Sequence, residues 1–290
     1  MLAAKSETDL AELENKSIFI LREVKSRFKK PAVLWSTGKD STTMLWLIKR
    51  AFFGEIPFPV IHIDTGYKPP EIYQFRDKLA KEWGFNLLVA KNDAEIEKGT
   101  SPFTTSKFDC CTRLKTMALK QLIEKERFDA IIVSIRRDEH GIRSYERYMS
   151  PRDKEFRWKI FQKEAARTGD SGFKSLQDTE LSGWMLFETD FGPECNHVRV
   201  HPILHWCEID VWRYIRQEKM PINPLYYSRN GERYRSLGCK PCTNPIKSDA
   251  SSIDEIITEL ETTSEEERAG RAQDKEDEYT MQKLRALGYM

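Results

Sequence analysis

Apolar residues follow two alternating patterns along the chain, short continuous runs and segments with helical spacing. The runs predict buried strands at 32–35, 60–64, 86–90, 130–135 and 198–204. The helical spacing predicts helices at 8–30, 41–53, 69–83, 113–127, 208–219, 253–260 and 275–287. Because strands that alternate with helices are typical of α/β proteins, we expect a parallel sheet with helices on both faces.

Two regions lack this periodicity. Residues 151–196 are polar and contain glycine, which predicts a long loop or insertion, and residues 221–250 hold Pro, Gly and Cys, which predicts an ordered loop. We therefore expect three parts: an N-terminal helix (1–30), an α/β domain (31–220), and a cysteine loop with an acidic, helical C-terminal tail (221–290).

The charge is spread unevenly over the 290 residues. The whole chain carries +1, from 47 Lys and Arg against 46 Asp and Glu, but residues 254–278 hold eleven acidic and three basic residues. That stretch has a net charge of −8, which leaves +9 on the rest. It is either a solvated helix face or mobile tail, or a docking surface for a partner or for the basic body. The neutral total therefore does not exclude a nucleic-acid partner.

Hydropathy and cysteine content indicate the compartment. The sequence has no apolar run of about 18 residues, and its first ten residues lack the apolar core of a signal peptide. We therefore expect a cytoplasmic protein without membrane contact. In that reducing compartment the six cysteines are not expected to form disulfides.

A polar loop, Ser36–Ser41, lies between the strand 32–35 and the helix 41–53. Free N–H groups and the dipole at a helix start form an anion site, and the glycine in the loop permits close approach of a phosphate. Lys39 would add a point charge, the two serines would donate hydrogen bonds, and Asp40 would bind Mg²⁺ or cap the helix. The spacing is not that of a Walker loop, and the alternative is an ordinary capped turn.

Arginines follow the strand 130–135. Guanidinium groups bind sulfate-like and phosphate-like anions with two parallel hydrogen bonds, which favours a substrate site. The alternative is a set of surface salt bridges, because acidic residues are interleaved with them. The arginines are Arg136, Arg137, Arg143 and Arg147, and the acids are Asp138, Glu139 and Glu146.

The cysteines form two pairs and two isolated positions. Two loops that each offer two thiols can supply four sulfur ligands, which suits a [4Fe–4S] cluster; zinc or free thiols are the alternatives. The pairs are Cys110 with Cys111 and Cys239 with Cys242, and the isolated positions, expected to have no ligand role, are Cys195 and Cys207.

The loop and several other segments resemble the N-type ATP pyrophosphatases, whose loop reads S-G-G-x-D-S. The S-x-G-K-D-S form seen here is similar to that of sulfate adenylyltransferase small subunits, and the resemblance continues through Phe58–Gly66, Glu71–Asp77, Arg136–Glu139, His201–Trp212 and the tail. It implies an adenine nucleotide alpha hydrolase-like fold and cleavage of ATP between its α- and β-phosphates, with adenylylation of an oxyanion.

The resemblance also implies roles for individual residues. The ATP-binding residues would be Ser36, Thr37, Gly38, Lys39, Asp40, Ser41 and Asp64. The catalytic residues would be Lys39, Asp40, Arg136 and Arg137, and the substrate anion would bind to Arg136, Arg137 and Arg143.

The two cysteine segments resemble the cluster-binding elements of adenylylsulfate reductases. Those enzymes carry a further catalytic cysteine near the C-terminus, whereas the last cysteine here is Cys242, which argues against a reductase. A body similar to sulfate adenylyltransferase combined with such a cluster resembles the ATP pyrophosphatase component of DNA phosphorothioation systems. This implies ATP, Mg²⁺ and a [4Fe–4S] cluster as cofactors, with a cysteine desulfurase and DNA or DNA-bound proteins as partners.

Three other functions stay open. The first is a sulfate adenylyltransferase small subunit that works with a GTPase large subunit and makes adenylylsulfate. The second is a thiolation enzyme acting on tRNA, since such enzymes share the loop and often a cluster. The third is a binding module without catalytic activity.

Overall fold

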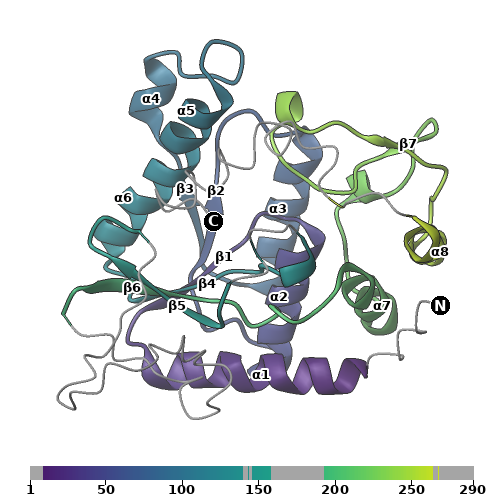
Figure 1. The fold of residues 1–290 in the computed structure, drawn as a ribbon, viewed down its shortest axis with the longest axis horizontal. Coiled ribbons are helices and arrows are strands. Elements are labelled where there is room, and N and C mark those ends of the chain that lie inside the picture. Colours follow the sequence, from purple (N-terminus) through teal and green to yellow (C-terminus); the bar gives the residue numbers. More distant parts are fainter. Residues whose placement is uncertain (1–8, 140–142, 144–145, 158–192, 264–266, 268–290) are drawn as a thin grey trace, which may run out of the picture.

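A six-stranded sheet forms the centre of the protein in the computed structural model, which describes residues 9–139, 143, 146–157, 193–263 and 267 (Figure 1). Five strands run parallel, and the edge strand β5 pairs antiparallel with β6. This confirms the predicted parallel sheet, except for the edge strand β5, which was not predicted. In spatial order the strands are β3 (Leu87–Ala90), β2 (Val60–Ile63), β1 (Pro31–Leu34), β4 (Ala130–Ile132), β6 (Cys195–Val200) and β5 (Met149–Asp153).

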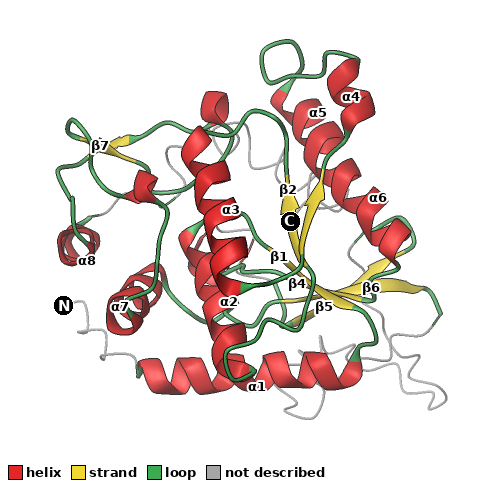
Figure 2. Cartoon of the chain, turned by 180° about the vertical axis from the view of Figure 1, so that it is seen from behind, coloured by secondary structure: helices red, strands yellow, loops and turns green. Residues whose placement is uncertain are grey.

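Helices cover both faces of the sheet. Figures 1 and 2 show α2 and α3 on one face and α6 on the other. This is expected for right-handed crossovers that run in opposite directions along the sheet, from β1 to β3 through α2 and α3, and from β3 back to β4 through α6. The helices are α1 (Leu10–Arg27), α2 (Lys39–Ala51), α3 (Pro70–Trp83), α4 (Asp93–Glu97), α5 (Lys107–Cys111), α6 (Met117–Glu126), α7 (Glu208–Glu218) and α8 (Ile253–Thr262).

The helix predicted at 113–127 is more complex than its spacing indicates. It begins as α5, passes through a wider π-helical turn at Thr112–Thr116, and continues as α6. Such turns are frequent at functional sites, and this one directly follows Cys110 and Cys111. The short helix α4 was not predicted because it has five residues and no apolar period.

The expectation of a loop over 151–196 is wrong at both ends. Residues 151–153 belong to β5 and residues 195–196 to β6. The pattern hid β5 because Ser150, Arg152 and Asp153 are buried polar residues, so the strand lacks the usual apolar alternation. Residues 158–192 and the helix predicted at 275–287 lie outside the described residues.

The remaining loop, 221–250, is ordered as predicted. It contains a small hairpin of β7 (Glu232–Arg233) and β8 (Ile246–Lys247) and two short 3-10 turns, Pro224–Tyr226 and Lys240–Cys242. The first turn brings Tyr226 against α2, and the second carries a cysteine pair. This loop therefore delivers side chains to the carboxyl ends of the parallel strands, where α/β sheets place their ligands.

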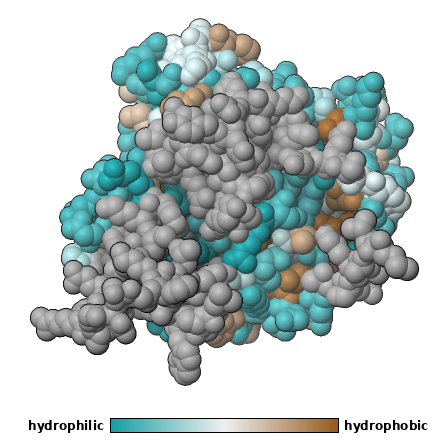
Figure 3. All heavy atoms as spheres, in the orientation of Figure 1, coloured by the Kyte–Doolittle hydropathy of each residue, from teal (hydrophilic) through white to brown (hydrophobic). Residues whose placement is uncertain are grey.

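The buried apolar residues form a continuous core that extends from α1 to α8. Leu13 and Leu21 of α1 and Ile256 and Ile257 of α8 belong to the same cluster as the sheet. No helix in the described part of the chain is long and apolar enough to cross a membrane. On the face drawn in Figure 3, the described surface is mostly hydrophilic, with apolar residues in small groups.

Candidate active site

The Ser36–Ser41 loop connects β1 to α2 as predicted, and α2 begins at Lys39, two residues earlier than its pattern indicates. The hydroxyls of Ser36 and Ser41 lie 3.1 Å apart, and Ser41 Oγ donates to the carbonyl of Gly38 at 3.1 Å. The N–H groups in the first turn of a helix have no partner within that helix. Together with the dipole they make the start of α2 an anion-binding position.

Gly38 lies close to two side-chain hydroxyls, so a larger residue would be crowded there. A Cβ atom at Gly38 would lie 3.3 Å from both Ser36 Oγ and the hydroxyl of Tyr226. That hydroxyl accepts a hydrogen bond from the backbone N–H of Lys39 at 2.8 Å. Tyr226 therefore caps α2 from the distant loop 221–250, which no local sequence signal indicates.

Thr37 adopts a backbone conformation that is rare for a β-branched residue. Its φ is 66°, its side chain is fully buried, and within the described residues its hydroxyl has no hydrogen-bond partner. Residues held in such conformations cluster at functional sites. The strain supports a ligand-binding role for the loop.

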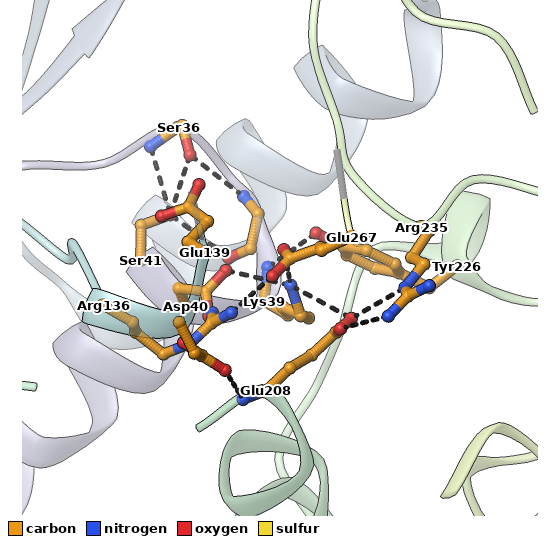
Figure 4. Close-up of polar contacts among 12 residues, drawn as sticks. Ser36, Lys39, Asp40, Ser41, Arg136, Glu139, Glu208, Tyr226, Arg235 and Glu267 are labelled. Atoms are coloured by element: carbon orange, nitrogen blue, oxygen red, sulfur yellow. Dashed lines mark hydrogen bonds and ion pairs between the residues drawn. The ribbon is translucent and has the colours of Figure 1, made fainter. Parts of the chain in front are cut away.

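Beside the loop lies a buried charged centre, formed by Lys39, Asp40, Arg136 and Glu267 (Figure 4). The carboxylate of Glu267 pairs with Lys39 Nζ through one oxygen and with the Arg136 guanidinium through the other. Asp40 also binds both cations, through Lys39 Nζ at 3.1 Å and through Arg136. Asp138 completes the pairing of Arg136 at 3.0 Å. Thus the chain compensates each buried cation with more than one carboxylate.

The charges of this centre are stabilised in their ionised forms. Burial alone would lower the pKa of Lys39, but Glu267 and Glu208 outweigh it and raise that pKa. The same holds for Arg136. Burial lowers its pKa, but Glu267 and the neighbouring acids outweigh burial and raise that pKa above its ordinary value. Burial would raise the pKa of Glu267, whereas Arg136 and Lys39 lower it. The centre therefore stays charged at neutral pH.

A second ion pair extends the centre toward the loop 221–250. Glu208, the first residue of α7, lies 3.7 Å from Lys39 Nζ and pairs with Arg235 at 2.8 Å. The backbone N–H of Glu208 donates to the carboxylate of Asp138 at 2.7 Å. Sequence reasoning did not identify Glu208 or Arg235, since their partners are distant in the chain.

The other predicted residues lie in different places. Arg143 lines the cavity of the loop and pairs with Glu139. Arg137 is turned away, with its guanidinium donating to the carbonyl of Glu146 at 3.3 Å. Asp64 follows β2 but accepts hydrogen bonds from Tyr73 and from a backbone N–H at 2.8 Å each. The structure thus brings Arg136 and Arg143 to the loop, and not Arg137 or Asp64.

The two cysteine pairs come together beside the same cavity. Cys239 lines it together with Ser36 and Gly38, and its sulfur lies 3.2 Å from the hydroxyl of Thr65. Burial, and next the neighbouring Cys111, raise the pKa of Cys110 to about 12, with further contributions from Cys239 and Cys242. The two cysteine segments, distant in sequence, thereby form one group of buried thiols. The backbone N–H of Lys240, beside Cys239, donates to the carbonyl of Tyr67 at 2.8 Å.

The cysteine group, Cys110, Cys111, Cys239 and Cys242, has the donor set of a [4Fe–4S] cluster, which takes four thiolates. Among the described residues, no three His, Cys, Asp or Glu side chains are arranged to hold a single metal ion. The isolated cysteines do not belong to the group: Cys195 lies in β6 and Cys207 precedes α7. All six are free.

Lys68 is a partly buried cation near Cys239 of the cysteine group. It lines the cavity, and its ammonium donates to Nε2 of His62 at 3.0 Å and to the carbonyl of Ile63. Burial lowers the pKa of Lys68 to about 7 and the pKa of His62 to about 2. His62 is therefore neutral and accepts this hydrogen bond. Sequence reasoning did not single out either residue.

An anion-binding loop at the carboxyl edge of a mostly parallel sheet is typical of nucleotide-binding α/β proteins, among which are those with the adenine nucleotide alpha hydrolase-like fold. The family model of the phosphoadenosine phosphosulfate reductase domain matches residues 30–245. The chain belongs to this family of enzymes.

Relatives of the chain are similar over its whole length. "Sulfate adenylyltransferase subunit 2" from Sulfurimonas denitrificans is 37% identical and covered completely in both chains. The protein of the same name from Pseudoalteromonas translucida is 37% identical, over 97% of this chain and 99% of its own.

Solved structures share the fold at low sequence identity. Phosphoadenylyl-sulfate reductase from Candida auris aligns with a TM-score of 0.52 and 14% identity, over 84% of this chain and 98% of its own. FMN adenylyltransferase from Candida glabrata in complex with ATP aligns with a TM-score of 0.54 and 16% identity, over 84% of this chain and 67% of its own.

Proposed function

We propose that the protein is an ATP pyrophosphatase that activates an oxyanion by adenylylation and passes it to sulfur chemistry at the cysteine group. The observation that carries this proposal is the shared cavity: Cys239 and the Ser36–Ser41 loop line the same space. Nucleotide activation and thiol chemistry in one cavity favour sulfur insertion over simple nucleotide binding.

The charged centre supports the first step. Lys39, Arg136 and the first turn of α2 provide positive charge for the β- and γ-phosphates of ATP. An oxyanion oxygen attacks the α-phosphorus, the bond from that phosphorus to the bridging oxygen breaks, and pyrophosphate leaves with its electron pair. Catalysis then comes from positioning and from stabilisation of the developing charge. The carboxylate of Asp40 is an oxygen ligand of the kind that Mg²⁺ prefers.

The cysteine group supports the second step. The four thiols of this group would hold a [4Fe–4S] cluster, which would supply iron–sulfur chemistry beside the activated oxyanion. With a DNA backbone phosphate as the oxyanion, sulfide attacks the adenylylated phosphorus, and AMP leaves with the former non-bridging oxygen. The sulfide would come from the persulfide of a cysteine desulfurase, reduced by a thiol. DNA, or a DNA-bound protein, is then the second partner, and the reaction is backbone phosphorothioation.

A sulfate adenylyltransferase subunit is the second candidate. It is favoured by the full-length similarity to proteins named sulfate adenylyltransferase subunit 2. In that function sulfate attacks the α-phosphorus, adenylylsulfate is the product, and a GTPase large subunit is the partner. The cysteine group would then have no part in the reaction.

One assay separates the two candidates. The anaerobically purified protein is given ATP and Mg²⁺ with either sulfate or a DNA oligonucleotide plus sulfide, and AMP and phosphorothioate are measured. The proposal expects DNA to stimulate AMP formation and phosphorothioate to accumulate. Stimulation by sulfate alone, with adenylylsulfate as product, would establish the second candidate instead.

A further inference from the structure

Glu267 reaches the charged centre from a distant part of the chain. It lies 228 residues after Lys39, and its two carboxylate oxygens bind the two cations that a nucleotide phosphate needs. A carboxylate that bridges Lys39 and Arg136 presents two oxygens to them, as a phosphate group does. The residue belongs to the acidic stretch 254–278, for which docking on the basic body was one of two predicted roles.

The carboxylate of Glu267 lies at the cavity proposed to bind the nucleotide. Glu267 lines this cavity together with Ser36, Gly38 and Ser41 of the loop, and the side chain is buried. Figure 4 shows it pointing toward Lys39, between the loop and Tyr226. A nucleotide phosphate held by the start of α2 and by Lys39 would therefore meet this carboxylate.

Charge balance makes joint occupancy unfavourable. Among the described residues, the ion pairs near the loop join four cations with five carboxylates, namely Lys39, Arg136, Arg143 and Arg235 with Asp40, Asp138, Glu139, Glu208 and Glu267. Phosphates would add further negative charge to these ion-paired groups, whose charges sum to −1. Like charges at short distance in such a site repel strongly. Departure of Glu267 restores the balance before the phosphates enter.

We infer that Glu267 is an internal competitor of the nucleotide, whose carboxylate occupies the phosphate position between Lys39 and Arg136 and is displaced when ATP binds. The inference rests on the proposed function, because it assigns the competitor to the same ATP site. Removal of the carboxylate strengthens phosphate binding, since the apparent affinity is reduced by the fraction of molecules in which the site is blocked.

The test measures binding of inorganic pyrophosphate and of ATP to the full-length protein by calorimetry, with and without Mg²⁺. Glu267→Gln keeps the size of the side chain and removes its charge, and we expect it to bind pyrophosphate at least about tenfold more tightly than the native protein. Glu261→Gln is the matched control: it makes the same change in the same acidic stretch, at an exposed residue that pairs with Arg213 at 3.0 Å. It should leave the affinity unchanged.

The outcomes separate this inference from the proposed function. Equal or weaker binding by Glu267→Gln would overturn the inference and leave the ATP site in place. If Glu267→Gln binds pyrophosphate more weakly than the native protein only when Mg²⁺ is present, Glu267 is a metal ligand. That result would also overturn the inference. If neither the native protein nor the variant binds pyrophosphate or ATP, both the inference and the proposed function fail.

A second measurement uses the native protein and so does not depend on how the variant folds. A water-soluble carbodiimide labels accessible carboxylates, and mass spectrometry quantifies the label on Glu267. Because Glu267 is buried in the charged centre, we expect little label without ligand and several-fold more with saturating pyrophosphate. A decrease on addition of pyrophosphate would contradict displacement.

Discussion

The charged centre and the cysteine group both reach one cavity, through Asp40 and Glu267 and through Cys239, yet the first group is ionised and the second is neutral. Lys39 and Arg136 are ionised, because carboxylates from three distant segments surround them. The thiol of Cys110 is kept neutral, because burial and its cysteine neighbours raise its pKa to about 12. A buried charge is stable only with a compensating partner. The first region obtains that partner from the chain, and the second region needs a bound cation to become a set of thiolates.

The largest expected effect is at the charged centre. Lys39→Ala removes the cation that faces both the first turn of α2 and Glu267, so we expect AMP formation to fall by about 10²–10³-fold. Lys49→Ala, near the other end of the same helix, is the control, because Lys49 lies over the ring of Trp46 instead. If AMP formation falls by less than about threefold in Lys39→Ala, the charged centre has no part in the reaction.

The next effect is at the cysteine group. Cys239→Ser removes one of four proposed cluster ligands, so iron and acid-labile sulfide, measured after anaerobic purification, should fall to near background, and sulfur transfer with them. Cys207→Ser, a half-buried cysteine outside the group, is the matched control. Full iron content in Cys239→Ser, or a native protein without iron, would mean that the thiols hold no cluster.

The pH dependence of thiol reactivity sharpens the contrast between the two regions. In metal-free protein the fraction of Cys110 thiolate should rise about tenfold per pH unit from 7 to 10 without a plateau, whereas a free thiol levels off near its ordinary pKa. Iodoacetamide labelling followed by mass spectrometry measures this rate.

The raised pKa of Cys110 also affects how the stability of the folded state depends on pH. Between pH 9 and 12 the unfolded chain releases this proton before the folded one, so Cys110 makes the folded state less stable as pH rises. A plateau in labelling below pH 9 would show that the thiol is not shielded.

The smallest effect concerns Thr37. Thr37→Gly removes a β-branched side chain from a φ of 66° and an unpaired buried hydroxyl, so we expect the free energy of unfolding to rise by about 0.5–1 kcal/mol. Denaturant unfolding measures it. A clear loss of stability would mean that packing of the side chain outweighs the backbone strain.

Sequence patterns predicted those features that short segments determine. Strand β1, the Ser36–Ser41 loop and the start of α2 are contiguous, so apolar spacing and one glycine indicated the anion site. The pairing of Cys110 and Cys111 with Cys239 and Cys242 was also predicted as a group, because two thiols per loop favour a shared site.

Features that depend on tertiary contacts could not be predicted. Glu208 and Tyr226 reach Lys39 only through the fold, and nothing in their neighbourhoods marks them. Glu267 lies in the acidic stretch for which docking on the basic body was one alternative, but the sequence did not indicate which residue would reach Lys39. Arg136 and Arg137 are adjacent in sequence, yet only the first points into the charged centre. Strand β5, which pairs with β6, was missed because several of its buried residues are polar, so its sequence lacks the apolar alternation of a strand.

The central claim is that the charged centre cleaves ATP between its α- and β-phosphates to activate an oxyanion. The most direct test follows radiolabelled ATP with the native protein, Mg²⁺ and an oxyanion acceptor, and separates all nucleotide and phosphate products. We predict AMP and pyrophosphate in equal amounts, formed only when the acceptor is present and absent in Lys39→Ala. Formation of ADP and phosphate, or turnover that does not depend on Lys39, would contradict the account.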